Sequence, residues 1–106
     1  MAVTSDRMQK LQQMLEREPN DTFLLYALAL EHKKGGAYAD ALDYLSRVLQ
    51  KDPGYCVAYQ QAGQVHELAG DNEAARRAYQ DGIAAALRKG DHHAAEEMQS
   101  ALQMLE

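Results

Sequence analysis

The sequence has few of the residues that mark secreted, membrane-bound or disulfide-rich proteins. Its 106 residues include one cysteine, two prolines and no tryptophan. Since Cys56 has no second cysteine to pair with, no intrachain disulfide can form, and we expect a cytoplasmic protein. The N-terminal segment lacks an apolar core of signal-peptide length. No run approaches the about 18 apolar residues of a membrane span, so we expect no membrane association.

Basic residues are also in the minority. Eleven Lys and Arg stand against sixteen Asp and Glu, for a formal net charge of −5. Nucleic-acid binders carry a basic stripe, and two short basic pairs, Arg76-Arg77 and Arg88-Lys89, do not make one. The sequence also has no Ser/His/Asp or Cys/His arrangement and no phosphate-cradling glycine loop. It therefore predicts no nucleic-acid binding, no enzymatic activity and no cofactor.

Helix-forming residues dominate what remains. Ala, Leu, Gln and Glu recur throughout, while runs of Val, Ile and Thr, which favour strands, are missing. A hydrophobic content of 46% is enough for one modest core. We expect a single all-α domain over residues 1–106, and the initial Met and the helical ends suggest a nearly complete protein.

A repeat of 34 residues organises the chain. A shift by that length places His32 on His66 and Gly36 on Gly70. The other matched pairs are Leu25 with Tyr59, Ala29 with Gly63, Ala41 with Ala75, and Leu45 with Tyr79. Self-similarity at this period is the signature of stacked helix pairs.

Each copy is predicted to form two helices joined by a glycine turn. Apolar spacing and stop signals predict about six helices, over residues 5–17, 22–33, 38–50, 55–68, 72–89 and 91–105. Gly35-Gly36 and Gly90 can take the left-handed conformation of a helix end, and Pro53 stops the helix before it. Gly82 lies inside a helix, where glycine costs about 1 kcal/mol relative to alanine. We therefore expect close packing of the final helix against Gly82.

The length and pattern of this unit resemble the tetratricopeptide repeat. The first copy matches the family pattern at Leu25, Leu28, Ala29, His32, Gly36, Ala41, Leu45, Val48 and Pro53. The second matches at Tyr59, Ala62, Gly63, His66, Gly70, Ala75, Tyr79 and Gly82, with Leu87 in place of the proline. The resemblance implies a right-handed α-solenoid of antiparallel helix pairs: an opening helix (5–19), two repeats (22–55 and 56–89) and a capping helix (91–105). It also implies a module that binds a protein or peptide.

In this family the first helix of each pair lines the concave side and contacts the ligand. Carried over by position, the contacts fall on Phe23, Tyr26, Leu30, Lys33, Val57, Gln60, Gln64 and Glu67. The first four are largely apolar and the last four largely polar, which suits an amphipathic helix or a peptide with one apolar anchor. Alternatively, Phe23 and Tyr26 cover the opening helix. Family members that clamp a terminal carboxylate use Lys and Asn at four of these positions, which Tyr26, Leu30, Gln60 and Gln64 occupy here, so we expect no such clamp.

Self-association is the second functional hypothesis. Two full repeats are fewer than a stack usually needs, so the terminal helices must cap the stack or recruit another copy. The final helix has an apolar face made of Met98, Ala101, Leu102 and Leu105. If one neighbouring helix cannot bury that face, a homodimer follows.

Four histidines admit a structural and a functional interpretation. His92 and His93 precede Glu96 and Glu97 at helical spacing, but one exposed helix makes a poor metal site, and the glutamates also favour the helix dipole. We expect no bound metal. His32 and His66 stand where the family usually has tyrosine. We expect them to be half-buried and hydrogen-bonded, and a pH-sensitive interface between repeats is the alternative.

Overall fold

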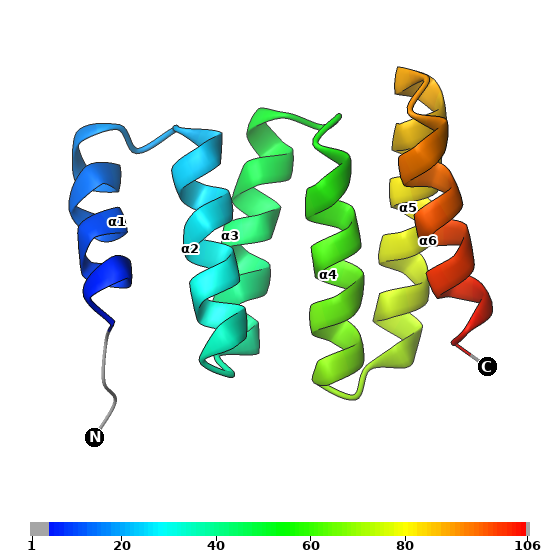
Figure 1. Cartoon of the computed structure of the whole chain (residues 1–106), viewed down its shortest axis with the longest axis horizontal. Coiled ribbons are helices and arrows are strands. Elements are labelled where there is room, and N and C mark those ends of the chain that lie inside the picture. The colour runs from blue at the N-terminus through cyan, green and yellow to red at the C-terminus, as the bar shows by residue number, and fades with distance from the viewer. Residues whose placement is uncertain (1–4, 106) are drawn as a thin grey trace.

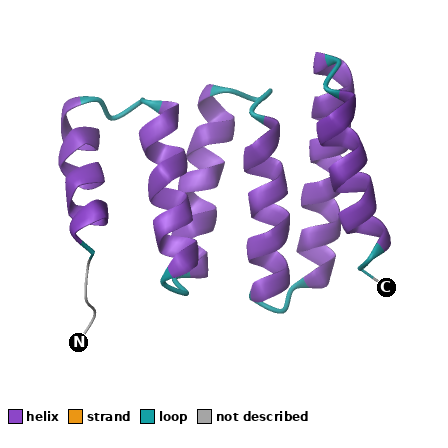
Figure 2. Ribbon diagram, viewed as in Figure 1, coloured by secondary structure: helices purple, strands orange, loops and turns teal. Residues whose placement is uncertain are grey.

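The computed structural model describes residues 5–105, which form six α-helices and no strand. The helices are α1 (Asp6–Arg17), α2 (Thr22–Lys34), α3 (Tyr38–Lys51), α4 (Cys56–Leu68), α5 (Asn72–Lys89) and α6 (His92–Gln103). They stand side by side in chain order (Figure 1), and only short turns join them (Figure 2). The predicted all-α helical repeat fold is confirmed. Residues 1–4 and 106, which the predicted domain includes, lie outside the described residues.

Local sequence signals account for where the helices begin. The side chains of Ser5, Asp21, Asp71 and Asp91 each accept a hydrogen bond from the backbone N–H three residues further on, at 3.0–3.1 Å. Such a cap satisfies one of the free N–H groups of a first turn and contributes about 1 kcal/mol. Four of the six helices therefore begin at a residue whose chemistry favours a helix start.

Three of the helices, α2, α4 and α5, end at a glycine turn. Gly36, Gly70 and Gly90 have φ between 81° and 84°, the left-handed region that side chains with a Cβ rarely adopt. In the Gly35-Gly36 pair, the left-handed residue is Gly36. The last helix ends at Gln103, earlier than the expected Leu105, which lies beyond the helix and is buried.

The helices form two layers. In Figure 1, α2, α4 and α6 lie toward the viewer, and α3 and α5 lie behind them. We call the surface formed by α2, α4 and α6 the front face. Each pair of helices packs closely (α2 with α3, α4 with α5), α1 packs on α2, and α6 packs along α5 and also contacts α4.

Three core clusters follow this pairing, and one of them joins α1 to α2 through Leu11, Leu24, Ala27 and Leu28. The first of the other two joins α2, α3 and α4 through Leu25, Leu45 and Val65, all at most 1% exposed. The second joins α4, α5 and α6. Its buried members are Cys56, Ala75, Tyr79, Ala86, Ala95, Met98 and Leu105.

Two glycines permit the closest helix contacts of the second cluster. A Cβ on Gly63 would fall on the Tyr79 ring, and a Cβ on Gly82 would lie 2.6 Å from Tyr59 Cβ and 3.1 Å from Met98 Cε. The expected packing of the final helix against Gly82 is confirmed. The free-energy cost of a glycine inside α5 is therefore offset by contact with α4 and α6.

Candidate functional site

The eight residues predicted to bind a partner come from α2 and α4, the two front helices of the repeats. Both helices run in the same direction, since one repeat separates them (Figure 1). Phe23 and Val57 therefore lie at the same end of the front face, and Lys33 and Glu67 lie at the opposite end. The structure thus divides the predicted site into two ends with different surroundings.

The polar end is connected by hydrogen bonds within the chain. Lys33 Nζ donates to Gln61 Oε1 and to Gln64 Oε1, each at 2.8 Å, and so connects α2 to α4. Lys33 and Gln64 line a pocket of about 350 Å³ together with Glu67 and Leu68. Because its amine already has two acceptors, Lys33 connects α2 to α4. It therefore has less hydrogen-bonding capacity for a partner than an unbonded lysine would have.

Glu67 accepts a hydrogen bond from the hydroxyl of Tyr79, which reaches from α5 beneath Gly63. Burial, followed by the hydrogen bond and charge of Glu67, raises the pKa of Tyr79 well above its usual value. The phenol is therefore a neutral donor across the physiological pH range. The Glu67 carboxylate thus has a structural role as well as an exposed position.

Gln60 makes a similar connection toward α6. Its Nε2 donates to Glu97 Oε2 at 3.1 Å. The two residues share a pocket of about 410 Å³ between α4 and α6. The remaining residues around this pocket are Tyr55, Cys56, Val57, Lys89, Asp91, His93 and Ala94.

The apolar end is open. Phe23 is 64% exposed and Val57 is 41% exposed, although both are large apolar side chains. Phe23 does not cover the opening helix, because Leu24 and Leu28 make the apolar contact with α1 instead. These two exposed side chains are the part of the predicted site with no visible structural role.

Tyr26 lies beside this end and is half-buried. Its ring packs 5.4 Å from the ring of Tyr55, centroid to centroid, and at a tilt of 53°. Burial raises the pKa of Tyr26, and Tyr55 raises it further, while a hydrogen bond from Gln61 lowers it. Tyr26 belongs to the cluster between α2 and α4, not to the contact with α1. Leu30, the remaining α2 position, is also half-buried.

Several residues of this surface were missed at the level of sequence. Tyr55 and Gln61 lie just outside the transferred positions, and the final helix was considered as a cap or a self-association surface, not as part of the partner-binding face. Helix α6 lies beside α4 on the front face, but it begins 36 residues after α4, two more than the repeat of 34. Because of these two extra residues, a shift by 34 places Gly63 on Glu97 and Gln64 on the buried Met98, so the period does not identify the front residues of α6.

The apolar face predicted for self-association is largely used inside the chain. Met98 is fully buried and Leu105 is 6% exposed, and both pack with Tyr79 in the second core cluster. Ala101 and Leu102 are half-buried against the same cluster. Because α5 and α4 cover α6, little of the expected apolar face is left for a second copy.

The histidines lie in three different environments. His93 Nε2 is 2.6 Å from Glu97 Oε1 on the exposed side of α6, and His92 is exposed. In residues 5–105 no three His, Cys, Asp or Glu side chains lie close enough together to hold a metal ion. His32 stacks on Tyr44, with ring centroids 5.2 Å apart and an interplanar angle of 13°. His66 is half-buried on the opposite side of α4 from the front face.

No helix in the described part of the chain combines the length and the apolar character needed to cross a membrane.

Comparison with known proteins agrees with this architecture. The family model described as tetratricopeptide repeat matches residues 1–105. A TPR repeat-containing protein of Pseudomonas aeruginosa is 30% identical over 96 residues, which are 91% of each chain. A solved protein from Bordetella parapertussis is 29% identical, with a TM-score of 0.84 over 96% of this chain and 89% of that one.

The fold of PcrH is also similar. PcrH, solved in complex with the chaperone binding region of PopD, gives a TM-score of 0.86. The match covers 94% of this chain and 76% of PcrH at 19% sequence identity. At that identity the likeness concerns the fold alone.

Proposed function

Because the chain belongs to the tetratricopeptide repeat family, we propose that it is an adaptor or scaffold that binds a peptide or an amphipathic helix of another protein on its front face. Tetratricopeptide repeats are generally non-enzymatic modules for protein–protein interaction. The observation that carries the proposal is the exposure of Phe23 and Val57 at one end of that face.

Two exposed apolar side chains at one end of a surface offer the partner an anchor. Burial of an exposed phenylalanine or valine stabilises a complex by roughly 1.5–3 kcal/mol each. Beside Val57 lies the pocket between α4 and α6, which can receive a side chain of the partner. The contact with the partner is thus expected to be mainly apolar at this end.

The polar end is expected to orient the bound partner more than to increase its affinity. Lys33, Gln64 and Glu67 are already hydrogen-bonded within the chain or to a neighbouring helix. Side chains held in this way lose little entropy on binding, which favours a rigid polar rim around an apolar centre. We therefore expect Phe23 and Val57 to contribute most of the binding free energy.

The PcrH complex supports a peptide as the class of partner. PcrH has a similar fold and was solved with the chaperone binding region of PopD. We propose the same class of partner for this chain, a segment of another protein, without assigning its identity.

The test is affinity capture of partner proteins by the full chain and by charge variants. Phe23→Glu and Val57→Glu place a carboxylate where the apolar anchor is expected, and proteins captured by the wild type should be lost. The matched control is Met14→Glu, because Met14 is also a large apolar residue, 52% exposed, but lies on α1. Equal capture by all four proteins, with equal melting temperatures, would contradict the proposal.

A homodimer is the second proposal. It rests on the part of the predicted face that the chain does not bury, Ala101 and Leu102, and on Met104, which is 85% exposed next to them in the sequence. Light scattering over a concentration series tests it with Leu102→Glu and Met104→Glu. A dimer that both changes dissociate, with helicity retained in circular dichroism, supports it. A wild type that is monomeric throughout the series contradicts it.

We also propose a cytoplasmic location. Cys56 is buried, and its Sγ donates to the carbonyl of Gly54 at 3.4 Å, an arrangement that suits a permanently reduced thiol. Fluorescence of a C-terminally tagged chain in fractionated cells tests this, and a signal outside the cytoplasmic fraction contradicts it.

A further inference from the structure

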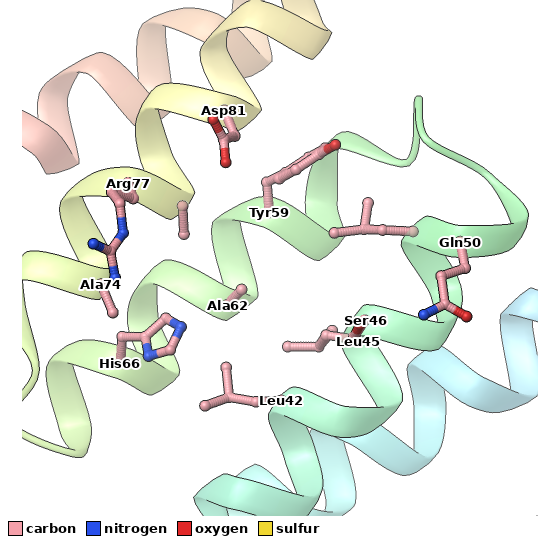
Figure 3. Close-up of a pocket in the computed structure, with 12 residues that line it drawn as sticks. Leu42, Leu45, Ser46, Gln50, Tyr59, Ala62, His66, Ala74, Arg77 and Asp81 are labelled. Carbon is pink, nitrogen blue, oxygen red and sulfur yellow. The ribbon is translucent and has the colours of Figure 1, made fainter.

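A groove of about 500 Å³ lies on the opposite side of α4 from the front face. We call it the back groove. Figure 3 shows it between α3 and α5, with α4 as its floor. Tyr59, Ala62 and His66 face it from α4, at helical spacing, whereas Val57, Gln60 and Gln64 face the opposite side of the same helix. The back groove and the front face are therefore separate surfaces.

The internal repeat explains why the groove exists. A shift by 34 residues places Ala62 on Leu28 and Ala78 on Tyr44. Leu28 is fully buried, and Tyr44 packs against the core clusters on both sides of α2. The second repeat thus has alanine at both positions where the first has a large side chain. The back groove is therefore lined by alanines at the positions where the first repeat has a leucine and a tyrosine.

The second repeat keeps the histidine of the first repeat beside the groove. His66 corresponds to His32, whose ring stacks on Tyr44 at 5.2 Å. In the second repeat the residue at the tyrosine position is Ala78, and within residues 5–105 no aromatic ring stacks on His66, which borders the groove. An aromatic side chain from another molecule can take the position that Tyr44 has in the first repeat.

Charged residues lie at the edge of the groove. Arg77 and Asp81 are exposed on α5, one helical turn apart. Figure 3 shows Arg77 extending toward Ala74 and His66, while Asp81 lies near the Tyr59 end. Among residues 5–105, neither side chain forms an ion pair, in contrast to Arg76, which pairs with Glu73 at 3.5 Å. A complementary ligand would have an acidic group at the His66 end and a basic group at the Tyr59 end.

From these observations we infer that the back groove is a second protein-binding site, which receives a tyrosine and a leucine side chain from an amphipathic helix of another protein. The tyrosine ring stacks on His66 and the leucine covers Ala62. An acidic residue beside the tyrosine faces Arg77, and a basic residue one turn away faces Asp81. The inference does not depend on the front face, because the two surfaces share no residue.

The test uses a defined probe, because the partner is unidentified. The probe is a short alanine-based helical peptide with leucine and tyrosine one turn apart, glutamate beside the tyrosine and lysine one turn away. It is titrated into the ¹⁵N-labelled full chain up to about 1 mM, since a ligand of this size binds weakly. We expect amide shifts around His66 and Ala78 and none around Phe23. A matched peptide with alanine in place of tyrosine should bind about tenfold more weakly.

A variant that restores the arrangement of the first repeat shows whether the amide shifts come from peptide bound in the back groove. Ala78→Tyr places a ring on His66 from within the chain, so it should abolish the shifts and raise the melting temperature by a few degrees. The matched control is Ala84→Tyr, at an exposed alanine of the same helix, which should leave the shifts unchanged and lower the melting temperature by no more than a few degrees through helix propensity. Melting temperatures show directly whether each variant is folded.

Three outcomes would overturn the inference. They are the absence of shifts around the groove in the wild type, shifts confined to the front face, and binding that persists in Ala78→Tyr. Phe23→Glu should leave peptide binding to the groove intact. Failure of this inference is therefore distinguishable from failure of the front-face proposal.

Discussion

The two repeats have the same backbone plan but different side chains at the points of closest packing. In the first repeat, Ala29 on the front helix faces a core that contains Leu45. In the second, Gly63 takes the place of the alanine, and the Tyr79 ring lies directly over it. A smaller residue on one helix has thus been matched by a larger residue on its partner, which preserves the packing density of the interior.

A second difference lies at the C-terminal end of each repeat. Val48 and Pro53 of the first repeat correspond to Gly82 and Leu87 of the second. Without a proline, α5 continues to Lys89, and the glycine lets Met98 of α6 approach it closely. The first repeat is therefore closed by α1 and by its own large side chains, whereas the second is closed by α6 and has an open back groove.

The largest expected effect comes from placing the residue of the first repeat into the second at the α5–α6 contact. Gly82→Val adds a branched side chain where a Cβ already lies 2.6 Å from Tyr59 Cβ. Because the Tyr59 Cβ is fixed to the backbone of α4, we expect a loss of about 3 kcal/mol or more in the free energy of unfolding. Urea denaturation measures it.

Ala84→Val is the matched control for that change, since Ala84 is exposed on the same helix. It should cost no more than about 0.7 kcal/mol, the difference in helix propensity. Similar losses in the two variants would show that packing against Gly82 is not what distinguishes α5 from α3.

An intermediate effect is expected from exchanging the Gly63–Tyr79 pair for its counterpart in the first repeat. Gly63→Ala forces a methyl group into the ring and should cost about 1–3 kcal/mol, and Tyr79→Leu leaves a cavity and should cost about 2–4 kcal/mol. The double variant relieves the clash. Its loss should be smaller than the sum of the single losses by about 1 kcal/mol or more in a double-mutant cycle. Strict additivity would mean that the two positions are not coupled.

A smaller effect, dependent on pH, is expected from the hydroxyl of Tyr79. Because the folded-state pKa lies above the unfolded value of 10.0, the unfolded chain loses this proton first as the pH rises. The stability that the buried neutral phenol provides is therefore complete below about pH 10 and decreases above it. Tyr79→Phe removes the hydrogen bond to Glu67, at a cost of about 1 kcal/mol at neutral pH. Thermal melts of both proteins between neutral pH and pH 11 should converge at the alkaline end, and parallel curves would contradict this role.

The smallest effect concerns the attachment of α1 to the first repeat. Arg7 Nε lies 3.8 Å from Glu31 Oε2, and the Arg7 side chain is 67% exposed. Exposed ion pairs contribute little, so Arg7→Gln should cost less than about 0.5 kcal/mol. In contrast, Leu11 is 7% exposed against α2, and Leu11→Ala should cost about 2–3 kcal/mol. Equal losses in chemical denaturation would indicate that charge, not burial, holds the opening helix.

Much of the fold was predictable from sequence because its signals are local. Asp21 and Asp91 cap the helices that follow them, and Gly36 and Gly90 end helices in the left-handed conformation. These interactions involve residues at most a few positions apart, so reading along the chain is enough to find them.

The candidate site was predictable only in part. The sequence placed the eight front residues on two helices, but Phe23 and Val57 differ from Lys33 and Glu67 only through contacts with other helices. The partners of the last two, Gln61 and Tyr79, lie 28 and 12 residues away in the chain, and periodicity alone does not identify such pairs.

By itself, the sequence determined the class of the protein, the number of helices and the family, because helix caps, glycine stops and a period of 34 residues are properties of the chain read in order. The tertiary structure alone decided which polar side chains are already hydrogen-bonded, that Met98 is buried by its own chain, and that alanines at 62 and 78 together open a groove. The physical reason is that exposure and cavity volume depend on the distances between helices, which no single segment specifies.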